Sequence, residues 1–316
     1  MIDQSWGYQV GDTVQLATLT RAGLVESRHH GLAVLVDTDG KVVEAHGHYK
    51  KLIYPRSALK PLQAVAVRRS GLILAGAELA ISAGSHQGTA AHRDLVLSIL
   101  QSVGLSETDL LCPLAWPGNP TSRSEVREQS KSAFNCSGKH AGFLAACVKN
   151  DWDTKSYLDL VHPLQQMIVE VTEEFAGEKI HHSTVDGCGA PLHALSLQGL
   201  ARSIGRFAAT EKDIASAMKA NAWAVGDKGQ WDSVILEHGM VSKIGAEGVF
   251  VIGLDSGHGV AVKIADGSMR AAGLVALKLL LNQSLIDSNL FKELYAALNV
   301  PSLGGSEVLG GIELTV

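Results

Sequence analysis

The four residues Ser57-Ala58-Leu59-Lys60 form the first group in the sequence whose types and spacing could do chemistry. At the start of a helix, residues three apart share one face, so the lysine amine would lie beside the serine hydroxyl. A lysine that is removed from water loses its proton more easily and can then act as the base that activates the serine. Pro61 is tolerated only near the first turn of a helix, so it places Ser57 where a helix begins. The tetrad therefore predicts a serine nucleophile with a lysine base.

The spacing of this tetrad is weak evidence by itself, because it occurs twice in the chain. Ser216 and Lys219 fit the same pattern within an ordinary amphipathic helix, where both side chains would be solvated. Two further polar side chains stand next to glycine turns: Ser85 follows an apolar run, and Lys243 precedes an apolar segment that reads as a strand. Ser85 would equally suit a helix N-cap, and Lys243 a surface loop, so spacing leaves both interpretations open.

Two cysteines in glycine-rich turns indicate a soft metal site. Cys136 lies in Asn-Cys-Ser-Gly-Lys-His at 135–140, and Cys188 lies in Asp-Gly-Cys-Gly at 186–189. A zinc site takes three or four protein ligands, and the candidates for the next ligand are His140 and, as a neutral amine, Lys139. Spacing does not choose between them, and two buried or capping cysteines would give the same pattern.

Composition and charge exclude several classes of protein. The 316 residues include 27 Lys and Arg against 32 Asp and Glu, giving a net charge of −5, and 46% of them are hydrophobic. This composition predicts a folded chain rather than a disordered one. Basic residues group only at 50–51 and 68–69, so we expect no nucleic-acid partner. The apolar stretches at 71–84 and 271–281 are too short to span a membrane, and residues 1–7 lack a secretory signal, so we expect a cytoplasmic protein.

Predicted strands lie near both ends of the chain, with predicted helices between them. Residues 32–37 and 41–45 read as a hairpin around the turn Asp39-Gly40, and 249–254 pairs in the same way with 259–264. Apolar residues at helical spacing predict helices at 90–103, 140–148, 156–175, 192–207 and 269–281.

These elements predict an α/β fold of the α+β type, in which an antiparallel sheet built from both chain ends is flanked by helices and a helical lobe is inserted between them. No repeat or linker divides the sequence, so we expect residues 1–316 to form a single catalytic unit. Its α/β lobe would comprise roughly residues 1–56 and 208–316, and its helical lobe roughly residues 57–207.

The motifs together resemble the Rhizobium etli-type L-asparaginases, the asparaginase II family. The resemblance covers nearly the whole chain in order, and its most specific elements are the segments 135–140 and 186–189. The other matching segments are 23–29, 56–61, 85–86, 162–163, 243–248 and 259–267. The family is similar in fold to serine β-lactamases and glutaminases, so the resemblance implies a serine β-lactamase-like fold.

The resemblance also implies an L-asparaginase, which hydrolyses the side-chain amide of L-asparagine to L-aspartate and ammonia through a serine acyl-enzyme. Ser57 matches the serine of the tetrad and Lys60 its base, while Ser85 and Lys243 match a second pair that faces the same pocket. The sequence does not decide which serine is the nucleophile, since each has its own lysine.

By the same resemblance, Cys136, Lys139 and Cys188 match the ligands of one zinc ion per chain, whose shell is completed by water. The zinc is expected near the substrate, where it supports binding, and His140 is then expected to contact the substrate. Arg56 suits the α-carboxylate of asparagine by its forked geometry.

Asp186 suits the α-ammonium of asparagine. Two departures from the family pattern leave the substrate range open: residues 113–120 lack the glycine-histidine pattern that is usual there, and Gln87-Gly88-Thr89 replaces a more acidic stretch. The alternatives are a related serine amidohydrolase acting on glutamine, a β-lactam or a peptide amide, a thiol enzyme with Cys136 as nucleophile and His140 as base, and a non-catalytic zinc-containing amino-acid sensor. A homodimer is expected from the family.

Overall fold

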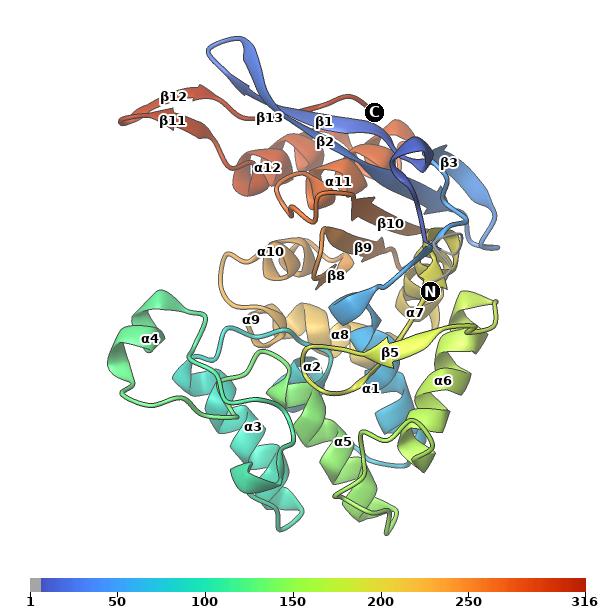
Figure 1. The fold of residues 1–316 in the computed structure, drawn as a ribbon, viewed down its shortest axis with the longest axis vertical. Coiled ribbons are helices and arrows are strands. Elements are labelled where there is room, and N and C mark those ends of the chain that lie inside the picture. Colours follow the sequence, from blue (N-terminus) through green and yellow to red (C-terminus); the bar gives the residue numbers. More distant parts are fainter. Residues whose placement is uncertain (1–6) are drawn as a thin grey trace.

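A computed structural model describes residues 7–316, and an antiparallel β-sheet forms its centre (Figure 1). Seven strands of the described residues make up this sheet, in the order β13-β1-β2-β10-β9-β8, with β3 also paired to β2. The strands are β1 (Val14–Arg21), β2 (Leu24–Val36), β3 (Val42–His46), β8 (Val241–Gly245), β9 (Val249–Gly253), β10 (Gly259–Ile264) and β13 (Ile312–Leu314). Segments from the two ends of the chain thus lie side by side, as predicted.

Both predicted hairpins are confirmed. Strands β2 and β3 pair in antiparallel fashion around the Asp39-Gly40 turn, where Gly40 adopts the left-handed φ of +79° that such turns require. Strands β9 and β10 pair with Ile252 opposite Val260. The two hairpins are joined by the pairing of β2 with β10, which closes the sheet between the N-terminal and C-terminal strands.

Alternating side chains on β2 divide the hydrophobic core into two parts. Leu32, Val34 and Val36 belong to the cluster that includes the helical lobe, whereas Ala33 and Leu35 belong to the cluster on the opposite face of the sheet. Successive side chains of a strand point to opposite faces, so a continuous apolar run is suited to the middle of a sheet that is covered on both sides.

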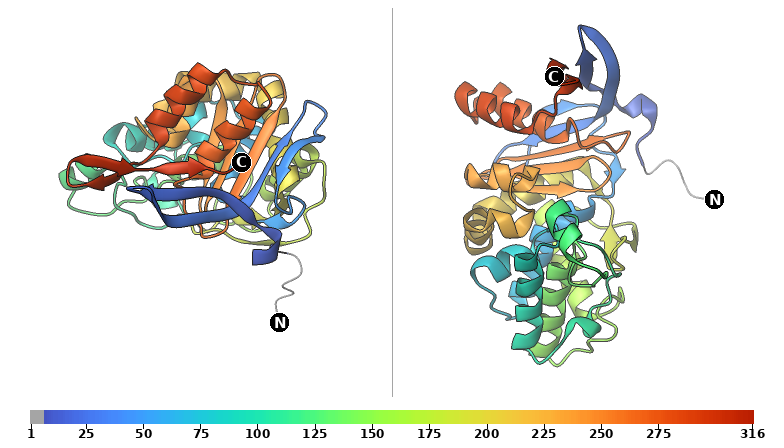
Figure 2. Two further views of the ribbon diagram at one scale, coloured as in Figure 1. Left: turned by 90° about the horizontal axis from the view of Figure 1, so that it is seen from above. Right: turned by 90° about the vertical axis from the view of Figure 1, so that its left-hand side faces the viewer.

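Helices cover both faces of the sheet and form a lobe beside it. In the described residues the helices are α1 (Lys60–Arg69), α2 (Gly76–Ser82), α3 (Ala90–Ser102), α4 (Pro120–Glu125), α5 (Ser137–Lys149), α6 (Pro163–Ala176), α7 (Leu197–Thr210), α8 (Lys212–Ala220), α9 (Ala222–Val225), α10 (Trp231–Glu237), α11 (Ala272–Asn282) and α12 (Ser288–Leu298). Helices α11 and α12 pack on one face, and α7 packs on the other, against β2, β9 and β10. The right-hand view of Figure 2 shows the sheet and these helices stacked above the helical lobe that contains α2 to α6.

The predicted α/β class, with a sheet from both chain ends and a helical lobe between them, is confirmed. The lobe boundaries stay predictions. Three predicted helices begin later than expected, and of these α11 differs least, since it begins at Ala272 rather than 269. Helix α6 begins at Pro163 rather than 156, because the His162 ring caps it by accepting a hydrogen bond from the Leu164 N–H. Helix α7 begins at Leu197 rather than 192, because the chain before it forms short strands and Ser196 caps the helix.

Three two-stranded pairs among the described residues complete the fold. They are β4 (Leu52–Ile53) with β7 (Leu195–Ser196), β5 (Ser183–Val185) with β6 (Pro191–His193), and β11 (Ser302–Gly304) with β12 (Glu307–Gly310). The β4–β7 pair ties down the chain directly before the tetrad that begins at Ser57. None of the helices in the described part of the chain has the length and apolar character needed to cross a lipid bilayer.

Candidate active site

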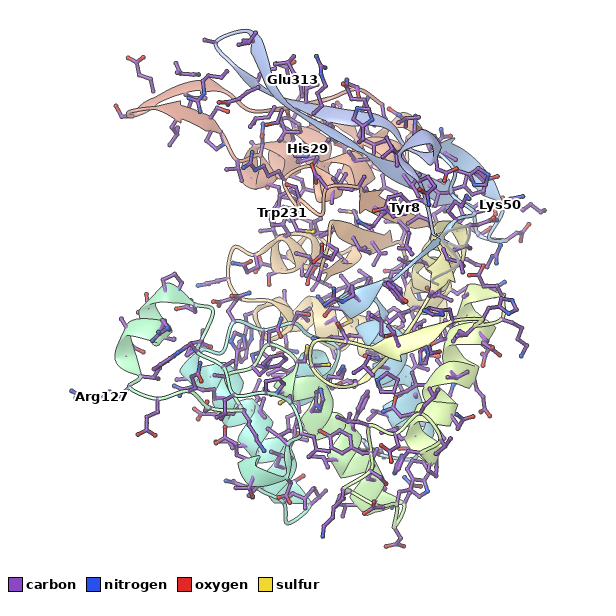
Figure 3. All side chains as sticks on the ribbon, in the orientation of Figure 1. Tyr8, His29, Lys50, Arg127, Trp231 and Glu313 are labelled. Atoms are coloured by element: carbon purple, nitrogen blue, oxygen red, sulfur yellow. The ribbon has the colours of Figure 1, made fainter. Side chains whose placement is uncertain are left out.

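A cavity of about 210 Å³ lies where the helical lobe meets strand β8. Ser57 and Ser85 both line it, so the structure brings the two predicted serines into one space. Trp231, on α10 between the sheet and the helical lobe, forms part of the wall (Figure 3). The other lining residues are Gln87, Asn135, Gly226, Gln230, Asp232, Ile244, Gly245, Ala246 and Met269. The wall therefore combines hydroxyl, amide and carboxylate groups.

Ser57 lies in a 3₁₀ turn, Arg56–Leu59, that leads into α1, as the tetrad predicts. The preceding Arg56 has a φ of +53°, a left-handed conformation that is unfavourable for a residue with a side chain. Such strain persists where the surrounding structure fixes the backbone. The Ala58 N–H donates to the Pro55 carbonyl at 3.1 Å, so this amide is already engaged and is not a free oxyanion donor.

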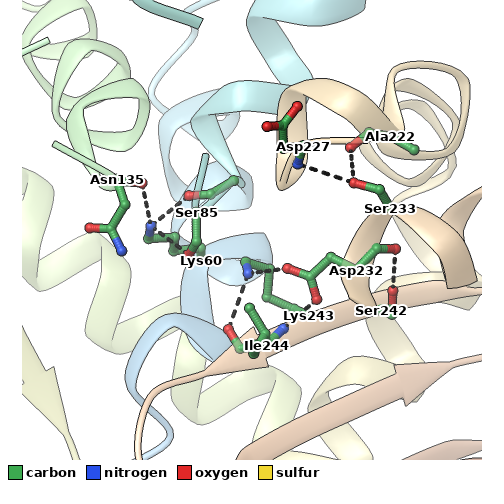
Figure 4. Close-up of polar contacts among 11 residues, drawn as sticks. Lys60, Ser85, Asn135, Ala222, Asp227, Asp232, Ser233, Ser242, Lys243 and Ile244 are labelled. Carbon is green, nitrogen blue, oxygen red and sulfur yellow. Dashed lines mark hydrogen bonds and ion pairs between the residues drawn. The ribbon is translucent and has the colours of Figure 1, made fainter. Parts of the chain in front are cut away.

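Lys60 is fully buried and its amine contacts Ser85 (Figure 4). Lys60 Nζ lies 2.5 Å from the Gly84 carbonyl oxygen, 2.9 Å from Ser85 Oγ and 3.3 Å from the Asn135 carbonyl oxygen. A neutral amine has two N–H groups and one lone pair. If the two carbonyls accept the N–H groups, the lone pair is directed at the Ser85 hydroxyl, which is the arrangement a base needs.

Burial lowers the pKa of Lys60 below that of an exposed lysine. The positive charges of Lys243 and Lys139 act in the same direction, and the Cys136 thiol acts in the opposite one. The surroundings therefore favour the neutral form of Lys60, in agreement with its set of uncharged acceptors.

The pairing of serines and lysines differs from the one expected. No hydrogen bond joins Lys60 to Ser57 within residues 7–316, and the serine that Lys60 contacts is Ser85. The physical reason is the backbone: Ser57 belongs to the 3₁₀ turn, while Lys60 begins the α-helix, and its long side chain reaches the turn after α2 that carries Ser85.

Lys243 is fully buried and forms an ion pair with Asp232. Lys243 Nζ lies 2.5 Å from Asp232 Oδ2 and 3.1 Å from the Ile244 carbonyl oxygen. The Ile244 N–H donates to the other carboxylate oxygen, Asp232 Oδ1, at 2.6 Å. Sequence reasoning missed Asp232, because an acidic residue in the first turn of a helix is common and carries no motif.

Burial raises the pKa of Asp232, and the Lys243 ammonium and the Ile244 N–H oppose this rise. The two lysines of the site thus have different partners. Lys60 contacts three neutral oxygens and lies near the Cys136 thiol, whereas Lys243 is held by a carboxylate.

Cys136, Lys139 and Cys188 come together, as the resemblance to the family implies. Lys139 Nζ lies 3.1 Å from Cys188 Sγ, and all three side chains are buried. A hydrogen bond from Cys188 holds the pKa of Cys136 well below the usual thiol value, and Lys60 and Lys139 lower it further. Within the described residues no three His, Cys, Asp or Glu side chains are arranged to hold a metal, so a metal site here depends on Lys139 as a ligand.

His140 is buried behind the cavity rather than in its wall. Its Nδ1 lies 2.7 Å from the Tyr157 hydroxyl, and its Nε2 is a buried nitrogen without a hydrogen-bond partner in the described part of the chain. Burial lowers the pKa of His140 to about 4, so the ring is neutral near pH 7. No hydrogen bond joins His140 to Cys136 within residues 7–316, which gives no support to a thiol and imidazole pair.

Arg56 and Asp186 pair with each other: Arg56 Nε lies 2.7 Å from Asp186 Oδ1. Both line a neighbouring cavity of about 480 Å³, together with Tyr8, Tyr54 and Lys263, rather than the cavity of the two serines. Their expected roles toward the carboxylate and ammonium of the substrate stay predictions.

His86, which follows Ser85, fixes the turn that carries this serine. Its Nδ1 accepts the Gly88 N–H at 3.1 Å, so its Nε2 carries the proton and donates to Ser137 Oγ at 3.0 Å. Ser137 in turn donates to the Ser132 carbonyl oxygen at 2.8 Å. This chain of hydrogen bonds holds the turn after α2 against the start of α5.

Comparison with known proteins places the chain in a family. A family model described as L-asparaginase II matches residues 17–314. A comparison with curated proteins finds no match. Among solved structures, Mglu in its glutamate form is 15% identical, with a TM-score of 0.45 over 81% of this chain and 60% of that one. A β-lactamase from Mycobacterium bovis is 12% identical, with a TM-score of 0.38 over 80% of this chain and 94% of that one.

The chain spans about three-fifths of the length of Mglu in its glutamate form. The family model, in contrast, covers nearly the whole chain, including both serines, both lysines and the cysteine motifs. The chain belongs to the L-asparaginase II family.

Proposed function

We propose that this protein hydrolyses the side-chain amide of L-asparagine to L-aspartate and ammonia through a serine acyl-enzyme, as a Rhizobium etli-type member of its family. The observation that carries the proposal is the 2.9 Å contact between Lys60 Nζ and Ser85 Oγ beside a cavity that also holds Ser57. Membership of the L-asparaginase II family supports an amide as the substrate.

Acylation would begin at Ser57. Because no hydrogen bond joins the Ser57 hydroxyl to Lys60 within residues 7–316, its proton would reach Lys60 through Ser85, which Lys60 contacts. The Ser57 oxygen attacks the carbonyl carbon of the amide, and its proton passes through the Ser85 hydroxyl to the Lys60 amine. The carbon–nitrogen bond of the tetrahedral intermediate then breaks. The proton held by Lys60 returns through Ser85 to the leaving nitrogen, which departs as ammonia, and an ester on Ser57 remains.

Deacylation would use the same base. Lys60, neutral again, takes a proton from a water molecule, and the resulting hydroxide attacks the ester carbonyl. The ester bond to the Ser57 oxygen breaks, aspartate is released, and the proton on Lys60 returns to that oxygen. Each cycle therefore consumes one water and restores the starting protonation of both serines and of Lys60.

Separate replacement of the two serines tests these roles. Ser57→Ala is expected to abolish ammonia release from L-asparagine and to leave no acyl-enzyme in a mass spectrum of quenched protein. Ser85→Ala is expected to lower kcat by about 10²-fold, the typical contribution of a positioned proton-transfer group, while an acyl adduct on Ser57 is still detected. An adduct on Ser85 in wild-type protein, together with activity in Ser57→Ala, would reverse the two assignments.

The same assay separates the competing functions. Ammonia from L-glutamine but not L-asparagine would overturn the choice of substrate and indicate a glutaminase. Tight binding of asparagine without turnover would indicate a sensor. Activity lost in Cys136→Ser but retained in Ser57→Ala, at unchanged zinc content, would indicate a thiol enzyme.

We further propose that Cys136, Lys139 and Cys188 hold a zinc ion. The donor set suits zinc, since two buried thiols and a buried amine lie in contact and the low pKa of Cys136 favours the thiolate that a metal needs. The same two thiols raise the pKa of Lys139, so its amine would have to lose a proton when it binds the metal. His140 adds a buried nitrogen, Nε2, that has no hydrogen-bond partner in the described part of the chain. When bound, zinc would act as a Lewis acid towards an oxygen of the substrate and so support substrate binding.

Metal analysis tests the zinc proposal without an activity assay. Protein purified without added zinc is expected to contain roughly one zinc per chain, and Cys188→Ser and Lys139→Met are expected to lose most of it. Cys147→Ser is the matched control, because Cys147 is a buried thiol on α5 whose pKa burial raises to about 12. Equal zinc in all three variants, or no zinc in wild type even after reconstitution, would contradict the proposal.

A further inference from the structure

The ion pair between Lys243 and Asp232 is unusual for its burial and its fixed geometry. Its side chains are 0% and 1% exposed, although Asp232 also lines the cavity. The carboxylate accepts one hydrogen bond at each oxygen, from Lys243 and from the Ile244 N–H. The backbone of Asp232 is held as well, since Ser242 Oγ donates to its carbonyl oxygen at 2.9 Å (Figure 4).

Stability alone does not explain such a pair. Taking two charges out of water costs free energy that their attraction often only balances, and apolar residues of similar volume are commonly as stable. The pair also joins two elements, α10 and the edge strand β8, that already pack together. Its place beside the two serines therefore points to the reaction.

Asp232 fixes the position of the Lys243 amine. Among the described residues, Lys243 interacts with the charged groups of Asp232 and, from α1, of Lys60. Apart from the carboxylate, the Lys243 amine has a single acceptor in the described residues, the Ile244 carbonyl oxygen. Without Asp232, this long side chain would be free to turn and compete with Lys60 for the hydroxyl of Ser85.

We infer that Asp232 is a positioning residue for the amide hydrolysis: it holds the Lys243 ammonium in one place behind the cavity wall, so that Lys60 alone contacts Ser85 as the base. This inference rests on the proposed function. It assigns the two lysines different tasks, with Lys60 moving protons and Lys243 providing a fixed positive charge. The uncharged acceptors of Lys60 and the carboxylate partner of Lys243 agree with this division.

A double-mutant cycle tests the inference. Asp232→Asn and Lys243→Met are each expected to lower kcat for L-asparagine by about 10²-fold or more, with KM changed less than about threefold. If Asp232 acts only through Lys243, the double variant is no slower than Lys243→Met alone. Asp232→Glu, which keeps the carboxylate, is expected to recover part of kcat.

Asp255→Asn is the matched control, since Asp255 also pairs with a lysine, Lys219, at 2.7 Å, but on the surface. It is expected to behave as wild type. Circular dichroism confirms that each variant is folded before rates are compared.

Three outcomes of the kinetic assay would overturn the inference: an unchanged kcat in Asp232→Asn, a rise in KM alone, or losses that multiply in the double variant. A rise in KM alone would instead make Asp232 a substrate-binding residue. A second readout does not depend on the substrate: a fluorophosphonate is expected to label the serines of Asp232→Asn about tenfold more slowly than those of wild type, and equal labelling rates would overturn the inference. Wild-type protein that releases no ammonia from asparagine or glutamine overturns the proposed function, while the labelling rates still decide the role of Asp232.

Discussion

Lys60→Met is expected to release ammonia from L-asparagine at least about 10³-fold more slowly than wild type. Methionine has nearly the length of lysine and packs well in an apolar site, but it cannot accept a proton. Ser85 would lose the only amine that it contacts within residues 7–316. Because Lys60 is fully buried and bonded to two carbonyl oxygens, its replacement leaves these acceptors unpaired at a cost of about 1–3 kcal/mol, so circular dichroism must show that the variant is folded before rates are compared.

The chain supplies its own control for this variant. Lys219 stands three residues after Ser216 on α8, so it has the same tetrad spacing, but it pairs with Asp255 at the surface instead of with a serine. Lys219→Met is expected to keep wild-type kcat in the same coupled ammonia assay. A Lys60→Met variant that retains turnover within tenfold of wild type would exclude Lys60 as the base.

Lys243→Met is expected to lower the free energy of unfolding by about 3–5 kcal/mol, the usual effect of removing one partner of a buried ion pair. The loss arises mainly from Asp232, which would be left buried without its counter-ion. Replacing both partners, as Asp232→Leu with Lys243→Met, removes the unpaired charge and is expected to recover most of the stability. Denaturant unfolding of the three proteins at one pH measures the difference.

The direction in which the stability of Lys243→Met changes with pH tests whether the unpaired Asp232 carboxylate causes the loss. Burial already raises the pKa of Asp232 in the wild-type protein, and without Lys243 less opposes that rise. In Lys243→Met the folded state therefore has a higher Asp232 pKa than the unfolded chain, so it binds a proton more readily. The variant should be closest to wild type at acidic pH and lose stability as the pH rises through that pKa. A deficit that is constant from pH 5 to pH 8 would contradict the assignment to Asp232.

Local patterns explain why much of the fold was predictable. The apolar run in β2, the Asp39-Gly40 turn and the paired segments at β9 and β10 each contain enough information to specify a hairpin. The predicted helix starts at 156 and 192 were wrong. In the first case a proline with a capping histidine overrides the apolar spacing, and in the second the pairing of β6 with the adjacent β5 and of β7 with the distant β4 does so.

The members of the candidate site could be predicted better than their contacts. Motifs identified Ser57, Ser85, Lys60 and Lys243, and the two serines share a cavity. Which lysine meets which group depends on side-chain reach between elements that are far apart in sequence. The role of Asp232 is the clearest case: nothing in its local sequence distinguishes it from a solvated acid, and only the packing of α10 on β8 makes it a partner of Lys243.

The pairing of β2 with β10 also sets the order in which the chain can fold during its synthesis. Strand β2 ends at Val36, whereas its partner begins at Gly259. At about 5–20 residues per second, the ribosome needs tens of seconds or less to make the intervening chain. During that time β2 has no partner on this side, while the helices of the lobe have local contacts and can form at once. The cavity wall at β8 is therefore completed only late in translation, which delays any activity until almost the whole chain has left the ribosome.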